Sequence, residues 1–255
     1  MKKIVVTADD FGWTKGVNEG IVRSVKEGIV TDIAMMVLTD HENCKHAVSL
    51  IEKNKLSHIG LHTCLFPWTK NFRPRRSDYI EFFKMATDGQ IEEKVMKEIE
   101  VFEKLIGKKP DFISPQFNMH GNLRLLKTVA KYAVENDIPV RIPRAVLVGD
   151  EITDKNYSAE IFLKRLGIKM TDHLLAHILG SSVTKITGMF ESELTEIKEG
   201  ESVELLLHPG YHDREIFEDS SLNYERTRDL VISLDPVFKD KILKMGFIFG
   251  HMSEI

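Results

Sequence analysis

The chain alternates between short apolar runs of strand type and longer amphipathic segments of helical type. Strand candidates lie at residues 4–6, 33–38, 59–62, 112–114, 140–142, 203–208 and 247–249, and helix candidates at 17–27, 43–53, 91–105, 123–135, 224–234 and 236–245. This order predicts an α/β fold in which helices wrap a parallel sheet. About seven strands favour a TIM-like (β/α) barrel, with fewer than eight strands allowed, over an open nucleotide-binding sheet.

Two segments interrupt the alternation. Residues 66–88 are expected to form a long loop with one tryptophan and three arginines, Trp68, Arg73, Arg75 and Arg76. Residues 150–199 are expected to form helices inserted after a strand. Loops at the carboxyl ends of barrel strands build substrate pockets, so the first segment is suited to stack on a sugar ring and to bind acidic or hydroxyl groups. A solvated surface loop is an equal alternative.

Composition narrows the class of protein and of partner. A chain of 255 residues and 29.2 kDa suits one barrel, so we expect a single domain over residues 1–255. The net charge of −4 and mixed charge distribution give no broad attraction for nucleic acid or anionic lipid, which favours a small-molecule partner. Cys44 and Cys64 are too few for a disulfide framework and are expected to be packing residues, with a catalytic Cys64 as a weaker alternative.

Location and assembly are less constrained. Residues 1–3, Met-Lys-Lys, are followed at once by a short strand, without the apolar core of a secretory signal, and no uncharged stretch is long enough to span a bilayer. We therefore expect a cytoplasmic protein. Apolar residues on the inserted helices leave a homodimer open.

Two adjacent carboxylates end the first strand candidate. Asp9 and Asp10 follow an apolar run that fits a strand covered on both faces. Adjacent acids repel each other, so holding both near a site requires a cation, a basic group or a shared proton. One acid as a metal ligand and the other as a general base satisfies this requirement. The alternative is that Asp10 caps the next helix.

Other polar residues also lie where strand candidates end. His62 follows one strand, residues 114–120 follow another, and His208 precedes Pro-Gly at the end of a third. In a parallel barrel one rim collects all of them, which suits a divalent metal with an activated water. We interpret His62 as a ligand and His208 as a general acid; a core histidine and a turn-stabilising histidine are the alternatives. For His120, capping of the next helix with Asn122 and catalysis have equal weight.

A second histidine pair is set apart from the strand ends. His173 and His177 lie four residues apart in an expected helix and would share one face. No nearby acid completes a metalloprotease motif, so surface or interface positions are the alternative. As candidates for metal binding, we rank this pair below the polar residues that follow the strand candidates.

The chain resembles the YdjC-like carbohydrate deacetylases, also called the ChbG/HpnK family. The strongest match is Thr-Ala-Asp-Asp-Phe-Gly at residues 7–12, followed by Gly-Val-Asn-Glu-Gly-Ile at 16–21 and Gly-Ile-Val-Thr at 28–31. Shorter matches are Ile-Gly-Leu-His at 59–62, Gly-Lys-Lys-Pro at 107–110, Val-Arg-Ile-Pro-Arg at 140–144 and Leu-His-Pro-Gly at 207–210. The similarity covers nearly the whole chain.

This resemblance implies a TIM-like barrel that uses a divalent metal, Mg²⁺ or Zn²⁺, to remove acetyl groups from N-acetylated amino sugars, commonly short chitin-derived oligosaccharides. It implies Asp9 as base, Asp10 and His62 as metal ligands and His208 as proton donor. His120, Arg141 and Trp68 are the residues expected to bind the substrate.

One motif departs from the family. The family usually carries Asp-Ser-His-x-His-x-His after Lys-Pro, whereas residues 114–120 read Ser-Pro-Gln-Phe-Asn-Met-His. Gln116 thus takes the place of the second metal histidine, Ser114 replaces the aspartate, and His120 is kept. An amide oxygen suits a harder ion better than zinc. We therefore expect a metal that is bound more weakly than in the family, a different metal, or no metal. A sugar-binding or regulatory protein without metal, and a hydrolase of another amide or ester, remain alternatives.

Overall fold

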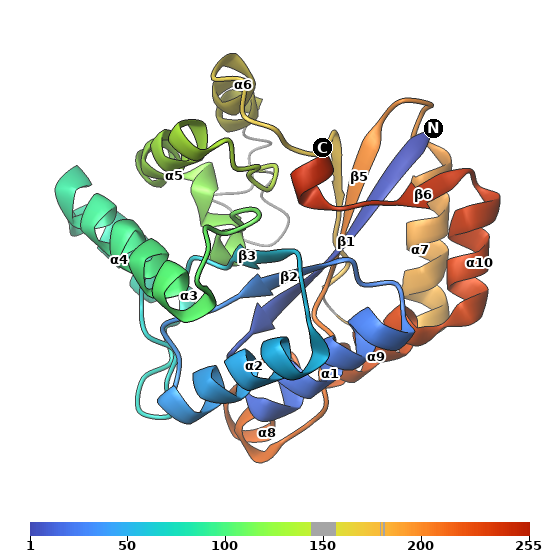
Figure 1. Cartoon of the computed structure of the whole chain (residues 1–255), viewed down its shortest axis with the longest axis horizontal. Coiled ribbons are helices and arrows are strands. Elements are labelled where there is room, and N and C mark those ends of the chain that lie inside the picture. The colour runs from blue at the N-terminus through green and yellow to red at the C-terminus, as the bar shows by residue number, and fades with distance from the viewer. Residues whose placement is uncertain (144–156, 179, 181) are drawn as a thin grey trace.

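A parallel sheet forms the centre of the computed structural model, which describes residues 1–143, 157–178, 180 and 182–255 (Figure 1). Its strands are β1 (Lys2–Phe11), β2 (Asp32–Met35), β3 (Ile59–Leu61), β4 (His173–Leu175), β5 (Ser202–Leu207) and β6 (Phe247–Phe249). Their order is β3-β2-β1-β5-β4, and β6 pairs with the start of β1. Every named pair is parallel, as expected when helices connect the strands.

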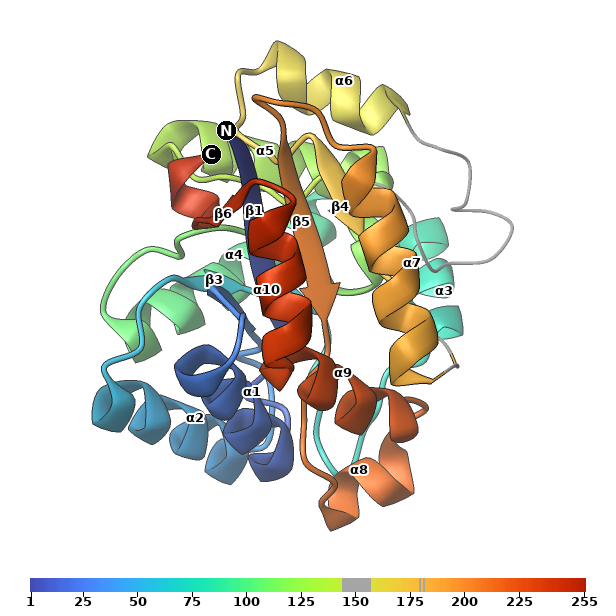
Figure 2. The ribbon, with the colours of Figure 1, turned by 90° about the vertical axis from the view of Figure 1, so that its right-hand side faces the viewer.

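Helices cover the outside of the sheet. They are α1 (Lys15–Glu27), α2 (His41–Asn54), α3 (Arg76–Met85), α4 (Asp88–Ile106), α5 (Leu123–Asn136), α6 (Tyr157–Arg165), α7 (Val183–Thr195), α8 (Arg214–Asp219), α9 (Tyr224–Leu234) and α10 (Pro236–Lys244). Figure 2 shows α7 and α10 in front of β1, β5 and β4. Short 3₁₀ turns lie at Gln116–Gly121 and Met252–Glu254. No helix in the described ranges has the length and apolar character needed to cross a bilayer.

The sheet curves beyond β3 through two single-residue bridges. Ile113 pairs in parallel with Leu61 on one side and with Val140 on the other. The amide of Val140 then donates to the carbonyl of Lys169, 3.0 Å away, shortly before β4 begins. In the described part of the chain no strand ladder closes this gap, so the arrangement is barrel-like with fewer than eight strands. The predicted α/β fold is confirmed.

The apolar run at the start of β1 is buried on both faces. Ile4 and Val6 belong to the main core between sheet and helices, whereas Val5 packs inside the curved sheet with Phe112 and Met252. Alternate residues of a strand point to opposite faces, so this run has to be apolar throughout. Val5 pairs with Glu204 of β5, which places a buried carboxylate on the inner side of the sheet.

Several expected elements differ from the structure. The strands expected at 112–114 and 140–142 are reduced to the bridges at Ile113 and Val140. The loop expected at 66–88 contains α3. The expectation of inserted helices over 150–199 is wrong in one respect, because this segment contains β4 between α6 and α7 and so supplies a strand of the sheet. Arg144 and residues 150–156, 179 and 181 lie outside the described residues.

The histidine pair at His173 and His177 does not share a helix, so that prediction is wrong. His173 begins β4, and its Nε2 lies 3.1 Å from Glu201. His177 follows the same strand and lies 2.6 Å from Glu193 of α7. A strand of only three residues carries too weak an alternation to be recognised against a helical pattern.

Gly60 of β3 is required by the packing of the inner face. A Cβ at this position would lie 2.5 Å from the ring of Phe112. We expect Gly60→Ala to lower the free energy of unfolding, measured in urea, by about 2 kcal/mol, because the core has to shift to admit the methyl group. The control is Gly188→Ala in α7, where an added Cβ meets no heavy atom within 4 Å and where Ala favours the helix. Equal stability of Gly60→Ala and the wild type would contradict this packing.

Candidate active site

A bulge at the end of β1 turns both acids into one pocket. The β1–β2 register shifts between Ala8 and Phe11, and Asp10 has a φ of +73°, in the left-handed region. In a regular strand Asp9 and Asp10 would point to opposite faces, whereas here both line the same pocket. The next turn is fixed by the amide of Gly12, which donates to Asn18 at 2.6 Å. Strained backbone of this kind is typical of functional sites.

Asp9 is held by a buried arginine. Nη1 and Nη2 of Arg141 donate to the two carboxylate oxygens of Asp9 at 2.6 and 2.9 Å. The same guanidinium donates from Nε and Nη2 to Glu204 at 2.9 and 2.7 Å. Burial, the largest single influence, would raise the pKa of Asp9, but the charge and hydrogen bonds of Arg141 act together with the neighbouring His62 and His208, and the pKa is lowered. Asp9 is therefore ionised at neutral pH in a fixed orientation.

Asp10 has one paired oxygen and one free oxygen. Its Oδ2 accepts from Nη2 of Arg226, an α9 residue, at 2.6 Å. Its Oδ1 is buried, has no hydrogen-bond partner among the described residues, and lies 3.5 Å from Nε2 of His62. Burial opposes ionisation, but Arg226 and the neighbouring histidines lower the pKa of Asp10 to about 2. A buried carboxylate oxygen that is ionised and accepts no hydrogen bond is suited to bind a cation.

His62 lies between the acids and the variant motif. Its Nδ1 is 2.9 Å from the hydroxyl of Ser114, and its Nε2 contacts Oε1 of Gln116. The backbone N–H of Gln116 donates to the backbone carbonyl of Thr63 at 2.9 Å, which places the motif beside the segment that follows β3. Oδ1 of Asp10, Nε2 of His62 and Oε1 of Gln116 therefore face one another. Two oxygens and one imidazole nitrogen fit a divalent cation.

His208 lies at the end of β5 on the wall of the same pocket. Its backbone amide donates to Asp229 of α9 at 2.9 Å, which fixes the turn. Its Nδ1 is buried without a hydrogen-bond partner in the described part of the chain. Burial lowers the pKa of His208, although Asp10 and Asp9 act in the opposite direction. The ring is neutral near pH 7 and is free to take and release a proton at the pocket.

Aromatic and basic side chains complete the pocket, which has a volume of about 740 Å³. Trp13 and Trp68 meet edge to face with ring centroids 5.2 Å apart. The guanidinium of Arg226 lies 4.8 Å from the centre of the Trp13 ring, and that of Arg73 lies 5.5 Å from it. Lys70, Arg75 and Arg76 also line the wall. An aromatic floor with basic walls suits a ring-shaped polar ligand.

The three residues expected to bind substrate do not share one position. Arg141 and Trp68 line the pocket, whereas His120 lies fully buried behind it. Nε2 of His120 donates to the carbonyl of Arg141 at 2.8 Å, and burial lowers the pKa of His120 to about 3. A neutral His120 thus supports Arg141 from behind. The helix cap expected nearby is supplied by Asn122, whose side chain accepts from the amide of Arg124.

Sequence reasoning missed several partners of the predicted residues. They are Trp13, Glu204, Arg226 and Asp229. Trp13 follows the acid pair by only three residues, so its proximity was a usable signal. The α9 residues carried none, because charged residues are common on exposed helix faces and burial is not visible in the pattern.

A family model described as YdjC-like protein matches residues 3–244. The chain belongs to the YdjC-like family. The resemblance of its motifs to this family is thereby confirmed, and the motifs at residues 7–12, 59–62 and 207–210 are the ones that supply the acids, His62 and His208.

Curated relatives of this YdjC-like chain are named as deacetylases. A carbohydrate deacetylase from Clostridium beijerinckii is 29% identical over 236 residues, which cover 89% of each chain. A chitooligosaccharide deacetylase from an Enterobacter species is 24% identical and covers 100% of this chain and 99% of the relative.

Solved structures share the fold. A protein from Enterococcus faecalis has a TM-score of 0.77 at 20% identity, covering 99% of this chain and 98% of its own. A polysaccharide deacetylase from Bacillus cereus has a TM-score of 0.53 at 12% identity, covering 98% and 92%. At these identities the likeness establishes the fold alone.

A buried glutamate holds the segment that follows His62 in this YdjC-like chain. Glu98 of α4 accepts from the amides of Cys64 and Leu65 at 2.8 and 3.0 Å. Leu65 has a φ of +61°, so this turn is held against its backbone preference. Cys64 is buried in the main core, as expected of a packing residue, and burial raises the pKa of its thiol well above its usual value.

Glu98 predicts a pH-dependent stability. Burial outweighs the two amide donors and raises the pKa of Glu98 from 4.5 to about 8. Between these values the folded protein binds a proton that the unfolded chain has released, so the stabilising contribution is full below pH 4.5 and is lost as the pH rises to 8. We expect the unfolding free energy of the wild type to fall relative to Glu98→Gln over this range, by at most about 1.4 kcal/mol per pH unit. Urea denaturation at pH 5, 6, 7 and 8 measures the difference, and a constant difference would contradict the shift.

Proposed function

We propose that this chain hydrolyses the acetamide of an N-acetylated amino sugar or short oligosaccharide. The observation that carries the proposal is that Asp9, Asp10 and His208 line one pocket together with both tryptophans of the chain. The names of the curated relatives support the same reaction class. An ionised acid, a free imidazole and an aromatic sugar platform are what deacetylation of a sugar requires.

A divalent cation would be held by Asp10, His62 and Gln116. Their donor atoms face one another, and Oδ1 of Asp10 is buried without a hydrogen-bond partner in the described ranges. Mg²⁺ or Zn²⁺ bound by these residues would act as a Lewis acid on the acetyl carbonyl. The two oxygen donors favour Mg²⁺ more than a site with two histidines would.

The remaining steps use side chains of the chain itself. Asp9 takes a proton from the water that attacks the acetyl carbon, and Arg141 keeps the carboxylate ionised and oriented during this transfer. His208 takes up a proton from solvent and delivers it to the leaving amine nitrogen as the C–N bond breaks, and Asp9 afterwards returns to solvent the proton it took from water. The lowered pKa of His208 makes delivery of its proton favourable, since the ring holds that proton weakly. Each positioned proton transfer contributes roughly 100-fold to 10,000-fold in rate.

The tryptophans and the basic residues would bind the sugar. Trp13 and Trp68 offer apolar ring surface, and Nε1 of Trp13 is buried without a partner among the described residues, which leaves it able to donate to a sugar hydroxyl. Lys70 and Arg75, which also line the pocket, suit hydroxyl or anionic groups of the ligand. Stacking on aromatic faces gives affinity, and the polar groups fix the orientation.

A second function is favoured by one contact. When Nε2 of His62 carries the proton, its contact with Oε1 of Gln116 is a hydrogen bond and the nitrogen has no lone pair for a metal. A chain held in this state would bind a carbohydrate without turnover. This alternative makes a distinct prediction, because sugar binding would then be independent of metal.

Acetate release from N,N′-diacetylchitobiose tests the proposal. The protein is chelated, dialysed and assayed alone and after addition of Mg²⁺ or Zn²⁺, while sugar binding is followed by intrinsic fluorescence. Trp13 and Trp68 are the only tryptophans in the sequence and both line the pocket, so the fluorescence reports on the site itself. We expect acetate only after metal is restored. Saturable sugar binding with no acetate under either metal would support the binding function instead.

A further inference from the structure

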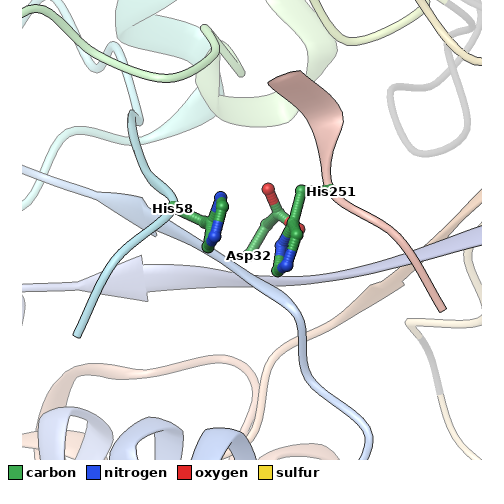
Figure 3. Close-up of side chains that lie close together, drawn as sticks. All are labelled: Asp32, His58 and His251. Atoms are coloured by element: carbon green, nitrogen blue, oxygen red, sulfur yellow. The ribbon is translucent and has the colours of Figure 1, made fainter. Parts of the chain in front are cut away.

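A second cluster of metal-binding side chains lies at the other end of the same strands. Asp32 begins β2, His58 immediately precedes β3, and His251 follows β6 (Figure 3). We call these three residues the amino-end cluster. We call the pocket lined by Asp9, Asp10 and His208 the acid pocket. Because His58 and His62 flank β3 four residues apart, the cluster lies about 13 Å along the strand from the acid pocket. The two sites are therefore separate.

The three side chains face one another closely. Asp32 is fully buried, and its Oδ2 lies 3.3 Å from Nδ1 of His251. The ring of His58 stacks on that of His251 with centroids 3.3 Å apart (Figure 3). One ligand atom from each residue can be chosen such that all three lie within 4.8 Å of one another. Coordination of one ion at about 2.0–2.2 Å requires these atoms to come closer together.

Charged groups of both signs surround the cluster. The carboxylate of Asp111 lies close enough to His58, and that of Glu254 close enough to His251, to influence their pKa values. Lys108 pairs with Asp111 at 2.6 Å and also acts electrostatically on His58, and Lys3 donates to the carbonyl of Glu254 at 2.6 Å. The buried carboxylate of Asp32 would itself be stabilised by a bound cation.

We propose that the amino-end cluster binds a divalent transition-metal cation such as Zn²⁺. Two imidazoles with one carboxylate form a common ligand set for Zn²⁺, and imidazole disfavours Mg²⁺. Both histidines are partly exposed, so water can complete the coordination. This proposal does not rest on the deacetylase function, because it involves none of the residues that line the acid pocket.

Metal binding requires one ring to turn. The two imidazole planes are within 7° of parallel, and a single ion cannot lie in both planes at once. The side chain of His251 is 28% exposed and that of His58 is also partly exposed, so rotation about the Cβ–Cγ bond has room. The bound state therefore loses the ring stack and gains two metal–nitrogen bonds.

The bound ion would join three separate segments of the chain. It would connect the start of β2, the start of β3 and the C-terminal residues, where Met252 already donates its amide to Asp32 and packs against Val5 inside the sheet. We expect such a cross-link to raise the temperature of unfolding, because the unfolded chain does not hold these ligands together.

The test is metal stoichiometry in the full chain. The chelated protein is titrated with Zn²⁺, and with Co²⁺ as a spectroscopic probe, in the wild type, in His58→Asn and in His251→Ala. Asn is chosen because His58 has a φ of +56°, which Asn tolerates. The control is His41→Asn, at an exposed position outside the cluster. Circular dichroism establishes that each variant is folded.

We expect the wild type and His41→Asn to bind one more Zn²⁺ per chain than either cluster variant, and Zn²⁺ to raise the unfolding temperature more in the first two than in the cluster variants. The Co²⁺ absorption of the extra site disappears in His58→Asn, whereas Mg²⁺ does not compete for it. Equal stoichiometry in all four proteins would overturn the proposal, whichever metal the acid pocket takes. Loss of the extra ion in His58→Asn alone, with full binding in His251→Ala, would also overturn the assigned ligand set.

Discussion

Asp9→Asn is expected to lower kcat for acetate release by about 1,000-fold or more and to leave the protein folded. The amide cannot accept the proton of the attacking water, so the step assigned to Asp9 is lost. The fold tolerates the change because Arg141 keeps its bonds to Glu204, and the buried guanidinium retains one carboxylate partner.

The matched control for this substitution is Asp137→Asn. Asp137 is the exposed left-handed residue at the end of α5, a position that Asn adopts readily, so the same chemical change is made far from the pocket. Steady-state kinetics and near-ultraviolet circular dichroism are recorded for both variants. Retention of more than a tenth of wild-type kcat by Asp9→Asn would remove Asp9 from the role of base.

Arg141→Met is expected to lower the free energy of unfolding by about 4 kcal/mol, the largest stability loss in the site. Arg141 is the only described side chain that donates to both Asp9 and Glu204, and all three are buried. Without the guanidinium, two carboxylates face each other in a region that excludes water. The loss is therefore expected to shrink at low pH, as the two acids become protonated.

Urea denaturation measures this effect, and two further variants interpret it. Lys241→Met removes a surface pair with Glu191 and is expected to cost less than about 1 kcal/mol. Arg141→Met combined with Glu204→Gln is expected to recover part of the stability, because one of the stranded charges is gone. A cost for Arg141→Met no larger than that of Lys241→Met would show that the buried network does not stabilise the fold.

Much of the fold was readable because its strands are buried on both faces. The continuous run before Asp9 identified β1, and the repeated strand–helix order identified a parallel sheet. β4 was missed because it has only three residues, His-Leu-Leu, which are too few to show a clear alternation of apolar and polar positions. The bridges at Ile113 and Val140 were overestimated as strands, since apolar residues there satisfy packing without a continuous ladder.

The position of the site was predictable for a related reason. Residues that follow parallel strands share one rim, so Asp9, Asp10 and His208 had to meet once the strand order was known. The motif at residues 7–12 marked the acids, but the bulge that turns both into the pocket depends on the pairing with β2 and leaves no signature in composition.

The electrostatic partners of the site were not predictable. Arg226 lies 216 residues from Asp10 along the chain, and Glu204 lies 63 residues from Arg141. Such pairs are fixed by the three-dimensional fold, and charged residues in helices and strands usually face solvent. The amino-end cluster is of the same kind, because His58 and His251 had no local context and approach Asp32 only through strand order.

The central claim, that water attacks the acetyl group of an amino sugar in this pocket, is tested most directly by the isotope content of the product. The metal-loaded protein is incubated with N,N′-diacetylchitobiose in ¹⁸O-enriched water, and the released acetate and remaining sugar are analysed by mass spectrometry. We expect acetate that carries one oxygen from the solvent, together with a sugar that has gained a free amine. Unchanged sugar, or acetate without the solvent oxygen, would contradict it.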